Sequence, residues 1–180
     1  MAVSTILVPT VILLSGAGQL AIVPTDGTQA ARLALARVCL PGVVEARPIE
    51  PLAKAEGMTM VSPTTVGAGP TDKAWRADPA APAYAVAWAD GSCTATLLKG
   101  DKDAARTMAE KEILSRPERF KHGATMLADH GRVEQSVYCA QVRNVWAVVT
   151  IAVPGPKGDA RTRAFSSTTY LRPTRSPLCG

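Results

Sequence analysis

A chain of 180 residues has the length of one ordinary domain, and its apolar share of 47% is sufficient for a hydrophobic core. Aromatic residues make up only 4% of the chain, so alanine supplies much of the apolar content and the core is expected to be thin. The net charge is +5, but so few aromatic side chains accompany the cations that the composition argues against a nucleic-acid partner.

The amino terminus has several features of a secretory signal peptide. Residues 1–25 carry no charged side chain, and Val3–Leu14 is an apolar run that is short for a membrane span. Ser15 and Ala17 are small residues at the −3 and −1 positions of a cleavage site, so we predict a signal peptide over residues 1–17. Cleavage there would leave no stable membrane span.

This leader differs from a typical signal peptide in one feature and from the leader of a lipid-anchored protein in another. No Lys or Arg precedes the apolar run, whereas a typical signal peptide begins with a positive segment. No cysteine follows the run at a position for lipid attachment, which argues against a lipid-anchored form. An uncleaved amino-terminal anchor and a buried strand of a cytosolic protein are the alternatives.

The next segment combines a helix with a proline-rich stretch. Thr25–Val38 is predicted to be the first helix, because apolar residues recur along it at helical spacing, and Pro41-Gly42 is predicted to end it. Residues 41–82 contain half of the fourteen prolines, so we predict a long, proline-rich surface loop there. This loop leaves room for a short helix at Pro48–Glu56 and a brief strand at Met58–Ser62.

Residues 83–100 are the best local structure signal in the chain. Apolar residues alternate with small or polar ones on both sides of Asp90-Gly91, which predicts two strands joined by a tight turn. Asp-Gly favours the type I′ turn, in which both central residues have positive φ. Cys93 lies just past the turn, so a disulfide there would tie the hairpin to a distant segment.

The second half of the chain is predicted to be one helix followed by three strands. Asp101 is a suitable N-cap for a helix over Lys102–Ser115, whose mixed charges indicate a solvated outer face. Phe120–Gly131 is polar and broken, which predicts a loop. The alternation in Val133–Val142 and Val145–Val153 predicts two strands, and the Ser- and Thr-rich segment Arg161–Leu171 predicts a last strand at the edge of the sheet.

These elements predict a single α+β domain over residues 25–172, followed by a carboxy-terminal tail at residues 173–180. Hairpin connections dominate, so the sheet is expected to be antiparallel, with about five strands and two main helices packed on one face.

Four cysteines are spread along the chain without a CxxC pair or zinc-ligand spacing, which argues against a structural metal site. An even number of cysteines in an exported chain predicts two disulfides. Four cysteines allow three connectivities, among which the sequence cannot choose. We favour Cys39–Cys93, because the first helix would lie over the strand that contains Cys93, and Cys139–Cys179, which would hold the tail. Four reduced thiols in a cytosolic protein are the alternative.

No catalytic, cofactor-binding or metal-binding residues are predicted. The two histidines, His122 and His130, lie in the polar segment before the last strands, with Asp129 beside His130. A metal site there would need Cys139 or Glu134 as a further ligand, and the spacing matches no ligand pattern. A thiol hydrolase using Cys139 and His130 conflicts with export, which favours oxidation of the thiol.

Most of the net charge lies near the carboxy terminus. Residues 155–180 contain one acid and five cations, a net charge of +4, which leaves +1 for the rest of the chain. The five cations are Lys157, Arg161, Arg163, Arg172 and Arg175. A solvated, soluble surface explains this charge most simply, and contact with an anionic envelope component, such as lipid headgroups or a cell-envelope polymer, is the more specific hypothesis.

Three features of the sequence indicate a resemblance to a known class of proteins. They are the uncharged leader, the helix LALARVC that ends in Cys39, and the turn Asp90-Gly91-Ser92-Cys93. The chain is similar, over about residues 25–150, to the small exported proteins of unassigned activity that are common in high-GC Gram-negative bacteria. This resemblance implies a periplasmic location and a Cys39–Cys93 bond, and it points to no particular activity, because such proteins have none assigned.

We therefore hypothesise a periplasmic or secreted, non-enzymatic protein that binds a partner protein or an anionic component of the envelope. A small hydrolase-like enzyme that uses the His122–His130 loop is one alternative. An inhibitor-like module that presents the loop at residues 41–82 to a partner is another.

Overall fold

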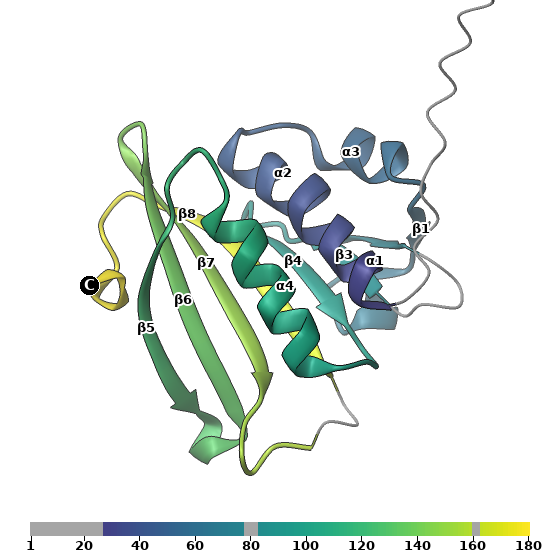
Figure 1. Ribbon diagram of the computed structural model, residues 1–180. Helices are drawn as coiled ribbons and strands as arrows, with labels where there is room; N and C mark the ends of the chain where they lie inside the picture. The colour runs from purple at the N-terminus through teal and green to yellow at the C-terminus, as the bar shows by residue number, and fades with distance from the viewer. Residues whose placement is uncertain (1–26, 78–82, 160–162) are drawn as a thin grey trace, which may run out of the picture.

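A single antiparallel sheet forms the main layer of the computed structural model, which describes residues 27–77, 83–159 and 163–180 (Figure 1). The sheet order is β1-β2-β3-β4-β8-β7-β6-β5, and every neighbouring pair is antiparallel. The strands are β1 (Thr59–Val61), β2 (Lys73–Arg76), β3 (Ala83–Ala87), β4 (Cys93–Leu97), β5 (Lys121–Ala128), β6 (Val133–Val142), β7 (Val145–Pro154) and β8 (Phe165–Arg172). The predicted signal peptide at residues 1–17 lies outside the described residues.

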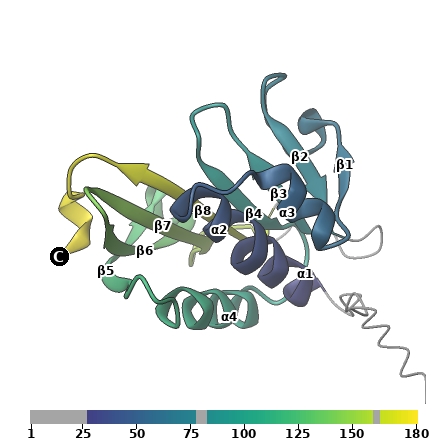
Figure 2. The ribbon, with the colours of Figure 1, turned by 90° about the horizontal axis from the view of Figure 1, so that it is seen from above.

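Three helical segments accompany the sheet in the described part of the chain. The first is continuous and consists of α1 (Gly27–Leu33), a π-helical turn η1 (Ala34–Cys39) and α2 (Leu40–Val44). It is followed by α3 (Ile49–Ala55) and, after the central hairpin, by α4 (Lys102–Leu114). The first helix and α4 lie side by side over one face of the sheet (Figure 2). Short 3₁₀ turns are η2 (Pro63–Val66), η3 (Asp129–Gly131) and η4 (Pro177–Cys179).

The core lies between these helices and the sheet. Alanines fill much of it, among them Ala34 on the helix and Ala95 and Ala147 on the strands, all fully buried. The largest buried side chains are Trp75 and Phe165. Because alanine removes little apolar area from water, each large side chain and each covalent tie matters more than in a core of leucine and isoleucine.

The prediction of about five strands and two helices is wrong. Among the described residues, the sheet has eight strands and three helical segments accompany it. The brief strand expected after Met58 exists as β1, and the short helix as α3, but β2 and β5 lie in segments predicted to be loops. β5 escapes recognition because it is an edge strand with a bulge between His122 and Thr125, which breaks the alternation that marks a strand.

The first helix continues past Pro41-Gly42, where the sequence predicted its end. In the π-helical turn the N–H of Leu40 donates to the carbonyl of Leu35, five residues back. Proline has no N–H, and its ring clashes with the preceding turn of a regular α-helix, so a wider turn immediately before Pro41 accommodates it. The helix ends at Val44 instead, and Ala46 follows with a φ of +56°.

β8 is not the edge strand that its serines and threonines suggested. It lies in the middle of the sheet, between β4 and β7. Ser167 and Thr169 are fully buried beneath the helices, and neither hydroxyl has a hydrogen-bond partner among the described residues. Exposure therefore does not explain the polar composition of this strand.

The central hairpin forms as predicted, but with a different turn. Gly91 has a φ of +84°, whereas Asp90 is not among the residues with positive φ, so the turn is not type I′. The N–H of Gly91 donates to the carbonyl of Trp88, and the Asp90 carboxylate accepts from the N–H and the hydroxyl of Ser92. These bonds describe a three-residue loop that ends in a left-handed glycine.

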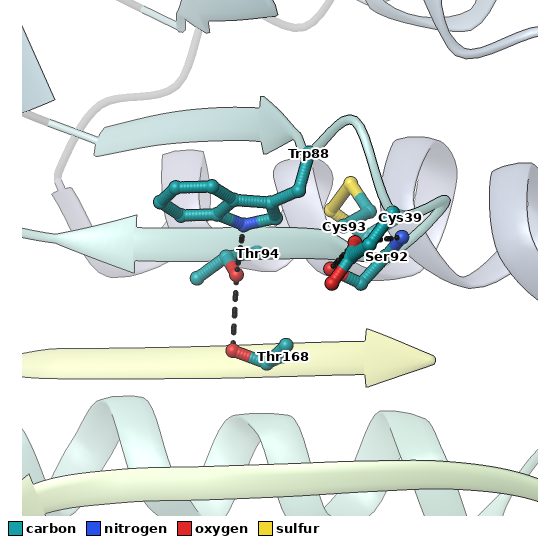
Figure 3. Close-up of a disulfide and its surroundings, with 7 residues drawn as sticks. Cys39, Trp88, Ser92, Cys93, Thr94 and Thr168 are labelled. Carbon is teal, nitrogen blue, oxygen red and sulfur yellow. Dashed lines mark hydrogen bonds between the residues drawn. A yellow bond between two sulfur atoms is a disulfide. The ribbon is translucent and has the colours of Figure 1, made fainter. Parts of the chain in front are cut away.

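Both disulfides join the cysteines that the sequence favoured. Cys39 at the end of η1 bonds to Cys93 at the start of β4, which ties the first helix to the hairpin (Figure 3). Cys139 on β6 bonds to Cys179 in η4, which holds the segment after β8 against β5 and β6. Cys39 and Cys93 are fully buried, and no described cysteine is free.

Replacing both Cys39 and Cys93 by alanine should lower the free energy of unfolding by about 4 kcal/mol, because the bond closes a 54-residue loop in the unfolded chain. Alanine keeps both positions apolar, so the change reports mainly the cross-link. Urea unfolding followed by circular dichroism measures it, and the wild type unfolded with a reducing agent is the control. An unchanged midpoint would show that the helix and hairpin are held by packing alone.

Candidate functional site

Two glycine-containing turns meet at one end of β6, β7 and β8. η3 leads into β6, and the loop after β7 folds back onto it: the N–H of Gly155 donates to the carbonyl of Arg132 at 2.7 Å, and the N–H of Lys157 donates to Gly131 at 3.1 Å. A Cβ on Gly158 would lie 2.2 Å from the carbonyl oxygen of Arg132, so only glycine allows this approach. The stacked turns bring Arg132 and Lys157 to the rim of the same cavity.

This cavity, which we call the basic cleft, has a volume of about 660 Å³. Its cations are Arg132, from the turn before β6, and Lys157 and Arg163, from the connection between β7 and β8, and all three are exposed. Its apolar wall comes from the ends of β6 and β7, including Val133 and Ala152. Ser166 adds a hydroxyl, and the acidic groups at the cleft are Asp129 and Asp159, of which Asp159 already has an interaction partner.

The cations of the basic cleft differ from most of those elsewhere in the described part of the chain. Seven cations take part in salt bridges, and they lie on or beside the helices or on β2: Arg32, Arg47, Lys54, Lys73, Lys102, Arg106 and Arg116. Arg132, Lys157 and Arg163 form no salt bridge with any described residue. Their charge is available to an anion that enters the cleft.

A second group of polar side chains lies between α4 and β6. Arg106 bonds to Glu110 at 3.0 Å on its own helix, makes a close ion pair with Glu134 on β6, and donates to the hydroxyl of Ser136 at 3.2 Å. The Tyr138 hydroxyl donates to Glu110 at 2.9 Å. Arg106 and Glu110 were expected on a solvated outer face, but they are part of the contact between helix and sheet.

This network shifts two pKa values. The hydrogen bonds from Arg106 to Glu110 and then to Glu134 raise the pKa of the guanidinium, because both carboxylates favour its charged form. Burial, followed by the bond to Glu110, raises the pKa of Tyr138, since the phenolate would be desolvated beside a carboxylate. Tyr138 is only 3% exposed, so the group stabilises the helix–sheet contact and offers little access to a ligand.

The two histidines lie at opposite ends of β5. His122 is on the strand and shares a hydrogen bond of 2.9 Å with the Thr125 hydroxyl, which in turn bonds to Ser136. His130 is in η3, beyond the other end, so roughly 20 Å of strand separates the two rings. The polar loop that the hydrolase-like hypothesis needs is a strand, and the structure does not bring both histidines into one site.

The residues nominated as nucleophile and metal ligands are engaged in other contacts. Cys139 is in a disulfide, so it carries no thiolate in this structure, and Glu134 is paired with Arg106. Across residues 27–77, 83–159 and 163–180, no three His, Cys, Asp or Glu side chains come close enough together to hold a metal ion.

Much of the predicted loop at residues 41–82, as far as Ala77, folds into α2, α3, β1 and β2, and residues 78–82 lie outside the described residues. Trp75 is on β2 and only 1% exposed, because its ring packs against the core. Its indole N–H has no hydrogen-bond partner in the part of the chain that the structure describes. The long loop of the inhibitor-like hypothesis is therefore largely regular structure over residues 41–77.

The sequence contained part of the signal for the basic cleft. The concentration of charge after residue 155 includes Lys157 and Arg163, whereas Arg132 comes from the turn before β6 and belongs to no basic run. Only the pairing of β6 with β7 brings Arg132 to the other two.

Comparisons with protein-family models, with curated proteins and with solved structures give no match for this chain. Among the described residues, no helix has the length and apolar character needed to cross a membrane.

Replacing Tyr138 by phenylalanine should make the stability less sensitive to alkaline pH. The folded pKa is raised, so the stabilisation is complete below pH about 10, the unfolded value for tyrosine, and is lost as the pH rises towards the folded value. The free energy of unfolding of the wild type should fall above pH 10 by up to about 1.4 kcal/mol per pH unit from this group. Urea unfolding of both proteins from pH 8 to 11 tests this: the curves should run parallel at pH 8–9, and parallel curves up to pH 11 would contradict the assignment.

Proposed function

We propose that this chain is an exported, non-enzymatic binding protein, periplasmic or secreted, that associates with an anionic component of the cell envelope. The basic cleft is the proposed point of attachment. Three cations that form no salt bridge with any described residue line a cavity large enough for a small anionic group, and this single observation supports the proposal most directly.

The chemistry of the cleft suits a phosphate or carboxylate group. Guanidinium groups such as those of Arg132 and Arg163 can donate two parallel hydrogen bonds to such oxygens, and the ammonium of Lys157 adds a compact charge. The apolar wall, with Val133 and Ala152, can contact the uncharged part of a larger ligand. Asp129 is also on the rim, and its carboxylate would repel a ligand group that placed a negative charge directly beside it.

The disulfides support the proposed location. Disulfides persist in oxidising compartments and are rare in the cytosol of most organisms. Every described cysteine in this chain is paired, and both bonds connect distant segments, 54 and 40 residues apart. A thin core of alanine gains more from such cross-links than a large core does.

Mass spectrometry of the protein from fractionated cells should find it in the periplasmic or secreted fraction, beginning at Gly18. Under non-reducing conditions its mass should be lower than that of the reduced chain by four hydrogens, because two disulfides form. A cytosolic protein that begins at Met1 and has four free thiols would disprove export and oxidation together.

Arg132→Gln combined with Lys157→Gln should weaken binding of tripolyphosphate by about tenfold or more, since two charge-assisted contacts are lost. Titration followed by the amide NMR signals of Ala152 and Val153 measures binding at the cleft itself. Arg37→Gln combined with Lys111→Gln removes the same charge from exposed sites away from the cleft, and it should bind as the wild type does. Equal weakening in the two double variants would indicate nonspecific attraction, and no binding by the wild type would refute the proposed function.

A further inference from the structure

The face of the sheet that points away from α1, α2 and α4 carries a separate small apolar cluster. Val137 and Cys139 on β6, Val148 on β7 and Cys179 in η4 form this cluster, apart from the main core. Because side chains alternate along a strand, Val133 and Gln141 point to the same side as Val137, and Trp146 and Ala152 to the same side as Val148. We call this side of β5–β8 the open face.

A second cavity, the distal basic cleft, lies at the other end of the open face. Its volume is about 450 Å³, and it is lined by Cys139, Gln141, Trp146 and Gly180 together with three exposed cations, Arg119, Lys121 and Arg175. These cations also form no salt bridge with any described residue. His122 is at its rim.

The distal basic cleft is held in place by contacts that span distant segments. The Cys139–Cys179 disulfide fastens η4 to β6. Arg175 lies over the Trp146 ring, with 5.2 Å from the guanidinium carbon to the ring centroid, and donates to the carbonyl of Cys179 at 3.1 Å. A guanidinium stacked in this way keeps donors free for an anion.

Both clefts reach the open face and lie at opposite ends of the same strands, although each also includes one residue of the helix-side core, Val153 in the basic cleft and Ala140 in the distal basic cleft. Val133 lines the basic cleft and Gln141 the distal one, and the eight steps of β6 between them cover about 25 Å. Figure 1 shows the two ends: η4 lies near one end of β5 and β6, and the turn between these strands at the other. β5, β7 and β8 contain no acidic residue, and the one on β6, Glu134, points to the helix side and pairs with Arg106. An anion that extends from one cleft to the other meets no carboxylate on these strands.

We propose that the open face binds a single linear polyanion that occupies both clefts at once. This inference rests on the proposed function and names its ligand class: a flexible chain with closely spaced phosphate or carboxylate groups. The cations line concave sites at two ends of a twisted sheet, which a flexible chain can follow, whereas a flat bilayer would meet only their rims. Occupying a second weak site on the same molecule raises the affinity by about 100-fold or more without any new contact.

Binding of inorganic polyphosphate of defined lengths tests the proposal. The wild type should bind a chain long enough to span about 25 Å at least about 100-fold more tightly than it binds tripolyphosphate, which reaches one cleft only. Arg119→Gln combined with Lys121→Gln should reduce the affinity for the long chain almost to that for tripolyphosphate. Arg37→Gln combined with Lys111→Gln should keep the gain, which controls for total charge. Isothermal titration calorimetry gives the dissociation constants.

The outcomes separate this inference from the proposed function. If the wild type binds tripolyphosphate but gains nothing from a longer chain, the proposed function survives and the two-cleft inference is overturned. The inference would also be overturned if the Arg119→Gln/Lys121→Gln variant still bound the long chain much more tightly than tripolyphosphate. The difference in affinity would then arise because a long chain can bind to one cleft through any of its many phosphate groups. Binding to vesicles of anionic lipid as tight as that to the long chain would replace the polymer with a membrane surface. If the wild type bound neither the long chain nor tripolyphosphate, both the proposed function and the two-cleft inference would be refuted.

Discussion

The attachment of the first helix to β4 is the constraint on which the rest of the structure depends. Cys39 and Cys93 join the two covalently, and the alanines on either side let the helix lie close to the strands. A core of small side chains provides little hydrophobic stabilisation per residue, so the disulfide adds to packing in holding the helix in position. With the helix fixed there, β4 is held in the middle of the sheet, and β8 pairs with it, burying Ser167 and Thr169.

The distribution of charge follows from the same layering. Helices lie on one side of the sheet, and the acids of α4 and β6 meet their cationic partners in that layer, as Arg106 does with Glu110 and Glu134. On the other side of the sheet, the helical segment that the structure describes is the short turn η4, which contains no acidic residue. The cations of the two clefts therefore form no salt bridge with any residue that the structure describes, and their charge can act on a ligand. A modest net charge of +5 for the whole chain conceals this asymmetry, because opposite charges cancel mainly on the helix side.

The best sequence predictions concerned elements whose signal is local. Asp101 caps α4 through its side chain, which accepts from the N–H groups of Asp103 and Ala104, as its position before the helix indicated. The strands β6 and β7 match their alternation almost to the residue. The wrong predictions concerned β2, β5, the end of the first helix and the position of β8, each of which depends on a neighbour distant in sequence. For the same reason the sequence indicated only part of the basic cleft. The excess of cations after residue 155 includes Lys157 and Arg163, whereas Arg132 joins them only through the pairing of β6 with β7.

The sequence by itself determined the hairpin at residues 83–100, the helix after Asp101, the number of cysteines and the excess of cations near the carboxy terminus, because periodicity, capping and composition act within a few residues. Only the tertiary structure decided the order of the strands, the burial of a serine- and threonine-rich strand, and the meeting of cations from separate turns at each end of one face. These depend on which distant segments come to lie side by side, and the free energy that selects them comes from packing and pairing between elements, which no single segment contains.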